Sequence, residues 1–514
     1  MAAAGYAPQY FQEQVHKHAE KRPDACAVRS GNTAITWSEL DSNTDELAAA
    51  FQVRGIQNQR IAVLVKEPLE FVQILIASLK ANNCFVPLPS MVTDEALRRM
   101  LEDSGSSCFV FSKAFRDTAA KLIGLEQLAH NVSIGCELSG CEPYGVFCNT
   151  GTEYRQLGAK PTDECNLIYS SGTTGAPKGI LLESKYRSSQ VSGWLAFGVD
   201  QSSRVMVTAS LYSNWSLTVV CATLNIGGTL VLPEKVDAES LLETCLDTSP
   251  THFVTVPIQL NRILNSESFQ SGSMPETLKI CAGSPFPASD KVRVMANWPL
   301  GGLIDLYGST EGGARTILYA HDHPDKLDSV GKPWPGMVGS IKIIDEAGNE
   351  VPTRHSGEIV GFSNVQMREY INLPEATDSV YWNDPNGKKY IRSGDIGRID
   401  PDGYLYLSGR KKDMIISGGF NIYASDLENV LTGHSLVVEA AVIGISSDRW
   451  GESPHAYVVA DKQGKASAAE ILAWANARLG KAQRLIGLTL CASLPRNSMG
   501  KIVKQELRDG FYGA

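Results

Sequence analysis

The stretch that decides the fold is Tyr169-Ser170-Ser171-Gly172-Thr173-Thr174-Gly175-Ala176-Pro177-Lys178-Gly179. It combines hydroxyl side chains, glycines and one lysine directly after an apolar segment. Glycines let the backbone approach an anion closely, hydroxyl and N–H groups donate to phosphate oxygens, and Lys178 adds a positive charge. The stretch therefore predicts a loop that holds a polyphosphate. Its candidate phosphate ligands are Ser170, Ser171, Gly172, Thr173, Thr174, Gly175 and Lys178.

Two other interpretations of this loop are weighed against the sequence. A Walker A loop is excluded, because Lys178 is followed by Gly179 and not by Ser or Thr. A flexible surface linker is the usual meaning of a Gly/Ser/Thr-rich cluster. The residues 177–179 lead directly into the apolar Ile180-Leu181-Leu182, which argues against a linker.

Further motifs follow the loop in a fixed order. They are Tyr307-Gly308-Ser309-Thr310-Glu311, Tyr390-Ile391-Arg392-Ser393-Gly394-Asp395, Gly409-Arg410-Lys411-Lys412-Asp413-Met414-Ile415-Ile416-Ser417-Gly418-Gly419 and Pro495-Arg496-Asn497-Ser498-Met499-Gly500-Lys501. Together with the loop they span nearly the whole chain. In this order the set resembles the adenylate-forming superfamily of acyl-CoA synthetases, luciferases and peptide-synthetase adenylation domains.

The alternation of helical and strand-like segments predicts an α/β protein. Thr36 and Glu39 fit the capping box of a helix that ends near Gly55. A strand is expected at 60–65, a helix at 71–79 and a strand at 84–88, which is a β-α-β rhythm. Further strands are expected at 205–207, 228–232 and 252–255.

The length of 514 residues exceeds what one hydrophobic core usually supports, so at least two domains are expected. From about residue 331 the pattern changes to shorter strands, with turn signals at 345–349 and 400–403. The last hundred residues read as a compact α+β unit. We therefore expect a large N-terminal domain (1–409) of α/β layers with a β-rich subdomain, and a small mobile α+β C-terminal domain (410–514).

Composition restricts the partners and the location. The net charge is -9 with no long basic run, which makes nucleic acid an unexpected partner. The N-terminus lacks a basic segment followed by an apolar one, and no apolar run is long enough to span a bilayer, so a cytoplasmic location is expected. The 11 cysteines are scattered, which favours reduced thiols. Cys136, Cys141 and Cys148 contain no Cys-x-x-Cys pair and do not predict a zinc site.

Residue chemistry supports nucleotide binding at the later motifs. Glu311 is a carboxylate suited to Mg2+, which prefers oxygen ligands, although a solvated loop carboxylate is the simpler interpretation of the residue alone. Tyr307 offers a ring on which adenine can stack, and Gly308 leaves room beside it. Asp395 can accept both ribose hydroxyls or can bond its own turn. Arg410 offers a planar fork to ribose or phosphate or lies in a solvated turn.

The resemblance adds roles to these and other positions. It implies that Asp395 and Arg410 bind the nucleotide, that Lys412 is the hinge of the C-terminal domain, and that Lys501 is the mobile catalytic lysine that reaches the carboxylate and the α-phosphate. It implies ATP, Mg2+ and coenzyme A as the small molecules used. Further implied positions are Thr174 and Arg410 in catalysis, Gly283, Ser284, Ser309 and Thr310 at the nucleotide, and Gly418, Gly419 and Phe420 along the pantetheine path.

The acyl pocket is expected at Ser213, Asn214, Trp215 and Gly308. Amino-acid-activating members of the superfamily carry an aspartate where Ser213 stands, which pairs with the substrate ammonium, and many acyl- and aryl-CoA synthetases carry a histidine there. Ser213 supplies no charge, so a free amino acid is disfavoured. Trp215 and Phe286 are candidate pocket walls, and ordinary core positions are equally compatible with their sequence.

The sequence thus predicts an ATP-dependent acid–thiol ligase that converts a small non-amino carboxylic acid to acyl-AMP and then to a coenzyme A thioester. Three alternatives remain: an enzyme that loads the phosphopantetheine of a separate carrier protein, a luciferase-like oxygenase, and a nucleotide-binding protein without catalysis. Glu311 and Lys501 together argue against the last alternative. The identity of the acid, the oligomeric state and the pathway do not follow from the sequence.

Overall fold

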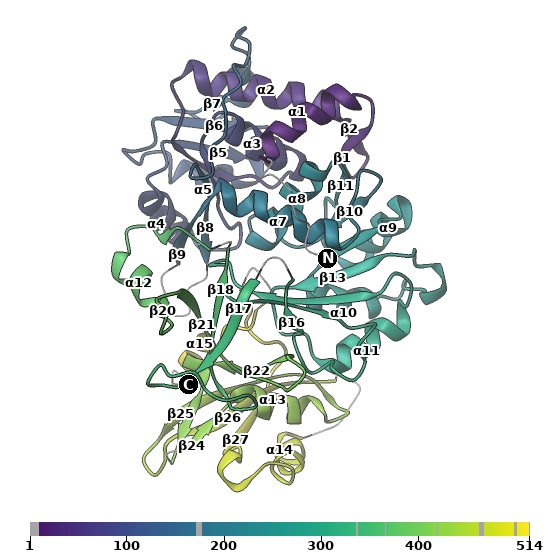
Figure 1. Ribbon diagram of the computed structural model, residues 1–514, viewed down its shortest axis with the longest axis vertical. Helices are drawn as coiled ribbons and strands as arrows, with labels where there is room; N and C mark the ends of the chain where they lie inside the picture. The colour runs from purple at the N-terminus through teal and green to yellow at the C-terminus, as the bar shows by residue number, and fades with distance from the viewer. Residues whose placement is uncertain are drawn as a thin grey trace. The chain divides into compact units, whose positions relative to one another are not determined.

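The computed structural model describes residues 10–170, 177–335, 338–364, 366–418, 420–461, 467–497 and 501–512 (Figure 1). Internal contacts divide the chain into two compact units. The first unit contains residues 1–340 and 361–391, and the second contains residues 341–360 and 392–514. The boundaries between the two units fall within strands. The domain boundary between residues 409 and 410 stays a prediction.

Two mixed sheets build the first unit. One has the order β16-β15-β14-β13-β12-β10-β11-β1-β2, and the other has the order β19-β9-β8-β4-β3-β5-β6-β7. The strands of the former are β1 Cys26–Ser30, β2 Thr33–Thr36, β10 Arg204–Val207, β11 Thr229–Leu232, β12 His252–Thr255, β13 Leu278–Ala282, β14 Leu303–Gly308, β15 Arg315–Tyr319 and β16 Lys332–Pro333. Those of the latter are β3 Arg60–Leu64, β4 Cys84–Pro87, β5 Cys108–Ser112, β6 His130–Ile134, β7 Glu142–Pro143, β8 Glu164–Ser170, β9 Lys178–Glu183 and β19 Glu369–Tyr370.

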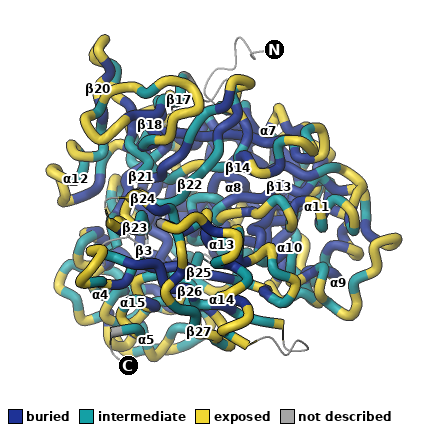
Figure 2. Tube along the Cα trace, turned by 90° about the horizontal axis from the view of Figure 1, so that it is seen from below, coloured by how far each residue is buried: buried dark blue, intermediate teal, exposed yellow. Residues whose placement is uncertain are grey.

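The main hydrophobic core of this unit draws side chains from both sheets and from the helices α2, α3, α7 and α8. Figure 2 shows α8 buried along most of its length, whereas α9 and α11 carry exposed residues. The helices of the unit are α1 Phe11–Lys21, α2 Trp37–Val53, α3 Pro68–Lys80, α4 Asp94–Ser104, α5 Arg116–Ala120, α6 Tyr144–Cys148, α7 Ser184–Ala196, α8 Asn214–Ile226, α9 Ala238–Thr248, α10 Pro257–Leu264, α11 Ala288–Asn297 and α12 Pro374–Ser379. The layered α/β class predicted from the sequence is confirmed.

The first predicted helix shows how local chemistry sets an element. Thr36 Oγ1 accepts from the Glu39 N–H at 3.2 Å, and Glu39 Oε2 accepts from the Thr36 N–H at 2.8 Å. This reciprocal capping box begins α2, as predicted. The helix ends before Gly55, which adopts a left-handed φ of 69° that suits glycine.

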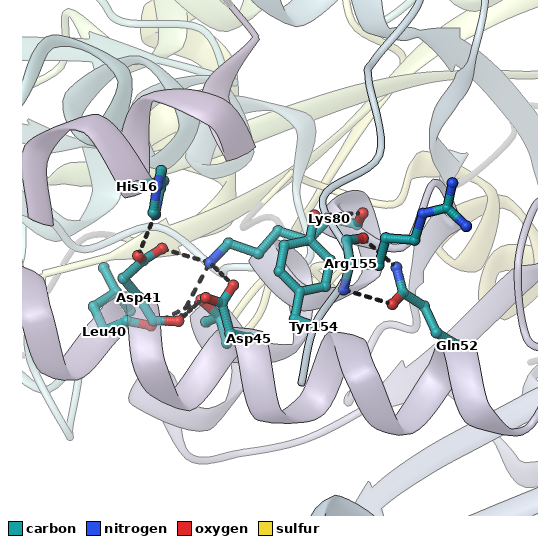
Figure 3. Close-up of polar contacts among 9 residues, drawn as sticks. His16, Leu40, Asp41, Asp45, Gln52, Lys80, Tyr154 and Arg155 are labelled. Carbon is teal, nitrogen blue, oxygen red and sulfur yellow. Dashed lines mark hydrogen bonds and ion pairs between the residues drawn. The ribbon is translucent and has the colours of Figure 1, made fainter. Parts of the chain in front are cut away.

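A buried ionic cluster joins the first three helices (Figure 3). Lys80, at the end of α3, is 2% exposed, and its Nζ lies 2.6 Å from Asp41 Oδ1 and 2.7 Å from Asp45 Oδ1 on α2. His16 Nδ1 on α1 lies 2.8 Å from Asp41 Oδ2. The Tyr154 hydroxyl donates to the Lys80 carbonyl at 3.0 Å, which attaches the segment around Tyr154 to the end of α3.

A third sheet contains β17 Val338–Ile344, β18 Gly357–Ser363, β20 Tyr381–Asn383, β21 Lys389–Ile399 and β22 Leu405–Arg410. It is the β-rich part expected after residue 331. The two predicted turns are present, because the Gly348 N–H donates to the Asp345 carbonyl and the Gly403 N–H donates to the Asp400 carbonyl.

The C-terminal part of the second unit packs a small sheet against helices. Its strands are β23 Ile415–Ser417, β24 Phe420–Ile422, β25 Val437–Ser447, β26 Gly451–Ala460 and β27 Gly487–Leu490. Its helices are α13 Ala424–Thr432, α14 Ala468–Asn476 and α15 Lys504–Tyr512. Among the described residues of the whole chain, no helix is both long enough and apolar enough to cross a membrane.

Candidate active site

The predicted phosphate loop connects two antiparallel strands. β8 ends at Ser170 and β9 begins at Lys178, and these two residues are partners in the strand register. The sequence therefore supplies a hairpin that brings a hydroxyl and an amine to the same end of the sheet. Ser171, Gly172, Thr173, Thr174 and Gly175 lie outside the described residues.

Tyr370 lies between this hairpin and the predicted metal ligand. The Lys178 Nζ lies 4.9 Å from the centre of the Tyr370 ring. The Tyr370 hydroxyl donates to Glu311 Oε1 at 2.8 Å. Burial, together with the neighbouring Glu311 charge, raises the pKa of Tyr370 above its ordinary value, so the hydroxyl keeps its proton.

Tyr370 is not among the site residues predicted from the sequence. It lies on β19, outside the motifs, and it reaches Glu311 because β19 pairs with β9. The Met367 N–H also donates to the Glu311 carbonyl at 2.8 Å, which fixes the segment before β19 beside the motif. No short motif in the sequence signals this tyrosine.

Several predicted residues lie at one edge of the other large sheet. β10, β12, β13 and β14 are parallel neighbours, so their carboxyl ends meet at that edge. Gly283 and Ser284 follow β13, and Tyr307 and Gly308 end β14. Ser309 and Thr310 continue beyond β14, and the Gly312 N–H donates to the Ser309 carbonyl in a turn that precedes β15. The ends of parallel strands are a common place for ligands in such sheets.

The predicted acyl-pocket residues are anchored at the start of α8. Ser213 is the N-cap residue, and its hydroxyl accepts from the Ser216 N–H at 3.2 Å. Asn214 Nδ2 donates to the Tyr186 hydroxyl at 3.2 Å. Trp215 Nε1 donates to the Thr255 carbonyl at 3.2 Å, and its ring lies 5.7 Å from that of Trp194.

Phe286 is buried at 7% exposure, and Trp215 packs against the main core. These contacts explain both aromatic residues as core. Their role as pocket walls stays a prediction.

In the second unit, the two predicted nucleotide ligands are paired. Asp395 on β21 and Arg410 on β22 are partners in the strand register, and Arg410 Nε lies 2.8 Å from Asp395 Oδ1. Arg410 Nη1 also donates to the Ser393 carbonyl at 3.3 Å. Arg410 therefore orients the carboxylate of Asp395, and the sequence predicted both residues as nucleotide ligands.

Ion pairs flank the predicted hinge residue on both sides. Lys411 Nζ lies 3.0 Å from Glu358 Oε2, and Asp413 Oδ1 lies 2.8 Å from Arg508 Nη2. Burial lowers the pKa of Lys412, which lies between them in a short 3-10 turn. The same Glu358 carboxylate also lies 3.1 Å from Arg392 Nη1.

The predicted pantetheine segment forms the β23–β24 hairpin. Gly418 has a φ of 57°, and its N–H donates to the Trp450 carbonyl at 2.7 Å. A Cβ at Gly418 would lie 2.8 Å from Trp450 Cε3, so glycine is required there. Phe420 is 63% exposed, and Gly419 lies outside the described residues.

Lys501 follows the last motif. Its N–H donates to Asn497 Oδ1 at 2.9 Å, and its carbonyl accepts from the Asn497 N–H at 2.9 Å. These reciprocal bonds hold the backbone of Lys501 beside the strand-like Arg496 and Ile502 pair. The residues 498–500 lie outside the described part of the chain.

Comparison with known proteins assigns the family. A family model described as AMP-binding enzyme matches residues 15–371, and one described as AMP-binding enzyme C-terminal domain matches residues 426–501. The chain belongs to the AMP-binding enzyme family. This confirms the superfamily inferred from the ordered motifs.

Individual relatives of this AMP-binding enzyme agree with the assignment. It is 30% identical to a feruloyl-CoA synthase from Amycolatopsis, with 96% of this chain and 98% of the relative covered. It is 27% identical to the fatty acid–[acyl-carrier-protein] ligase ScoC from Streptomyces coeruleorubidus, with 96% and 95% covered. The solved anthranilate CoA ligase AuaEII in complex with anthranoyl-AMP has the same fold, with a TM-score of 0.87, 23% identity and 99% of each chain covered. The predicted enzyme class, an AMP-forming acid–thiol ligase of the acyl-CoA synthetase type, is confirmed.

Proposed function

We propose that this AMP-binding enzyme activates a small non-amino carboxylic acid and passes the acyl group to coenzyme A. In the first half-reaction a carboxylate oxygen attacks the α-phosphorus of ATP, which gives acyl-AMP and pyrophosphate. In the second, the thiol sulfur attacks the acyl carbon, AMP leaves, and the thiol proton is released.

The observation that carries this proposal is the Lys178–Tyr370–Glu311 arrangement. It joins the strand after the phosphate loop to the carboxylate of the Tyr-Gly-Ser-Thr-Glu motif through one buried tyrosine. An amine and a carboxylate held together in this way suit a polyphosphate and its counter-cation, whose charges must be balanced while pyrophosphate leaves. We assign Lys178, together with Ser170, Ser171, Gly172, Thr173, Thr174 and Gly175, to the phosphates.

Mg2+ fits the residues at Glu311. The described residues contain no group of three or more His, Cys, Asp or Glu side chains arranged to hold a metal. A single carboxylate suits Mg2+, which usually binds one or two carboxylates, water and substrate phosphates. Glu311 would hold this ion, which when bound neutralises charge on the phosphate oxygens. Tyr370 restricts the carboxylate by donating to Oε1 and leaves Oε2 as the second oxygen.

The motifs of each unit contain residues that we assign to the nucleotide. We place adenine beside Tyr307, with Gly283, Ser284, Gly308, Ser309 and Thr310 around the nucleotide. Asp395 accepts the ribose hydroxyls in an orientation that Arg410 supports. Lys501 approaches the carboxylate and the α-phosphate in the adenylation step.

The acceptor is assigned to the second unit. We place the pantetheine arm along Gly418, Gly419 and Phe420, and the hinge at Lys412. Coenzyme A is the acceptor we favour. A separate holo-carrier protein is the second candidate, because the name of the relative ScoC specifies an acyl-carrier protein. We also propose a cytoplasmic location and no nucleic-acid partner, as the composition predicts.

Pyrophosphate exchange tests the proposal. The protein is supplied with ATP, Mg2+ and each member of a panel of aliphatic, aromatic and α-amino acids, and thioester formation is then followed with coenzyme A or with a holo-carrier protein. We expect exchange with a non-amino acid and thioester formation with coenzyme A. Exchange supported by α-amino acids alone would contradict the inference from Ser213, and product with the holo-carrier alone would select the second candidate.

A further inference from the structure

Two buried arginines lie beside one tyrosine of α7. Tyr186 has no exposed surface, and the centre of its ring lies 5.1 Å from Arg315 Cζ and 5.4 Å from Arg187 Cζ. Arg187 is 4% exposed and Arg315 is 7% exposed. Two positive charges are therefore gathered in the interior of the first unit.

These charges have no anionic partner in the described part of the chain. Arg187 Nε donates to Asn166 Oδ1 at 2.7 Å and its Nη1 to Thr218 Oγ1 at 3.0 Å, whereas its Nη2 has no partner among the described residues. Arg315 donates through Nη2 to the Tyr186 hydroxyl at 2.5 Å. The side-chain hydrogen bonds of both arginines to other described residues go to neutral groups alone. A buried charge is costly unless an opposite charge compensates it.

The cluster touches the predicted acyl pocket at two points. Arg315 on β15 is the strand partner of Gly308 on β14, and a Cβ at Gly308 would lie 3.1 Å from Arg315 Cγ. On the other side, Asn214 donates to the Tyr186 hydroxyl, and its buried Oδ1 has no partner among the described residues. Arg315 thus belongs to the same site as Asn214 and Gly308.

The tyrosine directs the arginine. The Tyr186 hydroxyl donates to the Thr310 carbonyl at 3.0 Å, so its lone pairs are left to accept from Asn214 and Arg315. The hydrogen bond from Arg315 Nη2 to Tyr186 thus fixes the orientation of the guanidinium among the described residues. Nη2 has a second N–H, and an Arg side chain oriented in this way can donate to a carboxylate oxygen from the edge that Nη2 shares with Nε or with Nη1.

We propose that Arg315 binds a second carboxylate of the acid substrate, so that the enzyme prefers dicarboxylic acids to monocarboxylic acids of the same size. This inference rests on the proposed function, because it names the substrate class of the same site. The reacting carboxylate goes to the nucleotide, and the distal carboxylate forms the ion pair that Arg315 lacks. Tyr186 is a positioning residue. The positive charge also disfavours a substrate ammonium, in agreement with the neutral Ser213.

Matched pairs of acids test the proposal. Pyrophosphate exchange is measured with succinate, adipate and terephthalate, and with the corresponding compounds in which one carboxylate is replaced by a carboxamide. The best dicarboxylate is expected to exceed its carboxamide partner in kcat/KM by about 10- to 100-fold, the range for one hydrogen-bonded charge. Equal kcat/KM values for the two members of every pair would overturn the proposal.

Variants separate charge from fold. Arg315→Met is expected to remove the preference for the dicarboxylate while KM for ATP stays unchanged, and Arg315→Lys to keep part of the preference. Tyr186→Phe keeps the charge and is expected to reduce the preference for the dicarboxylate, and because it also removes the bond to the Thr310 carbonyl, KM for ATP is measured separately. Arg293→Met, on the exposed face of α11, is the control and is expected to behave as the parent.

Two failures are distinguishable. If no acid of any class supports exchange although ATP binds, the proposed function itself is wrong. If acids support exchange and Arg315→Met lowers kcat/KM equally for both members of every pair, or raises KM for ATP, then Arg315 serves the nucleotide and the substrate assignment is wrong.

Discussion

Tyr370 belongs to none of the sequence motifs. Its proposed role is tested most directly by the rate of the first half-reaction. Its hydroxyl restricts one oxygen of Glu311, and its ring lies beside Lys178. Tyr370→Phe removes one hydrogen bond to a charged group, so adenylation is expected to fall by about 10-fold, equivalent to roughly 1.4 kcal/mol. The measurement is pyrophosphate exchange as a function of Mg2+ concentration. Tyr319→Phe, at a half-buried tyrosine that pairs with Ile304 and lies outside this arrangement, is the control and should match the parent.

Lys501 is proposed to act in one step only. Its charge offsets the negative charge that grows as the carboxylate approaches the α-phosphate, and the thiol step does not need it. Lys501→Ala should therefore slow adenylation by about 100-fold or more, roughly 2.7 kcal/mol. Conversion of chemically supplied acyl-AMP to the thioester should remain near the parent rate. Equal losses in both steps, with an unchanged melting temperature, would contradict the assignment.

At the scale of elements, the ion pairs of Lys80, Asp41, Asp45 and His16 connect α1, α2 and α3. Lys80→Met leaves Asp41 and Asp45 without their buried cation, and should lower the free energy of unfolding by about 3–5 kcal/mol. Denaturant unfolding followed by tryptophan fluorescence measures the loss. The triple variant Lys80→Met, Asp41→Asn, Asp45→Asn removes all three charges and should recover much of the stability. Arg99→Met, which breaks an exposed pair with Glu95, should cost less than about 1 kcal/mol.

Elements with strong local signals were predictable from the sequence. The capping box at Thr36 predicts the start of α2, and the strand expected at 252–255 matches β12. α3 begins at Pro68 and not at Phe71, because a proline is well suited to the first turn of a helix. The ends of these elements are thus determined by residues that lie close to each end.

The site was only partly predictable, for a physical reason. Ser170, Glu311, Asp395 and Arg410 belong to motifs that carry their chemistry in adjacent residues. The proposed roles of the other site residues depend on contacts between distant parts of the chain. The Tyr370–Glu311 contact spans 59 positions, the Tyr186–Asn214 contact 28 and the Arg315–Tyr186 contact 129. Such contacts depend on the register of strands that are distant in the chain, and no local pattern encodes them.

At the scale of the whole molecule, the two half-reactions need different groups beside the same acyl phosphate, so a reorientation at Lys412 is proposed. Lys412→Pro fixes φ at this point and should slow thioester formation more than adenylation. Lys412→Ala keeps the backbone free and is the control. The two rates are measured as pyrophosphate exchange and as single-turnover conversion of acyl-AMP. Equal losses in both would indicate misfolding and not a hinge.

Global stability should carry a pH signature from one buried lysine. Lys279 has no exposed surface, and burial lowers its pKa to about 7, whereas the unfolded chain binds the proton up to about pH 10.4. Between these values the unfolded state holds the extra proton, so stability rises with pH, by at most about 1.4 kcal/mol per pH unit. The contribution is most unfavourable below about pH 7 and is relieved as the pH rises.

Lys279→Met should remove this slope. The variant also leaves the Trp298 and Leu300 carbonyls without their donor, a cost that does not vary with pH. Urea midpoints of parent and variant at about pH 7, 8 and 9 separate the two effects. A parent-minus-variant difference that stays constant with pH would mean that Lys279 remains charged in the folded state.

The register of β8 and β9 restricts how the loop between them can evolve. Ser170 and Lys178 are partners, and a slip of one position would exchange side chains between the two packed faces, since Ile168, Ile180 and Leu182 lie in one hydrophobic core and Leu167 and Leu181 in another. The connecting residues can therefore change in kind more easily than in number. An engineer who exchanges this region between family members should treat 164–183 as a single cassette of constant length, since shortening or lengthening it would be resisted by the strands and not by the loop.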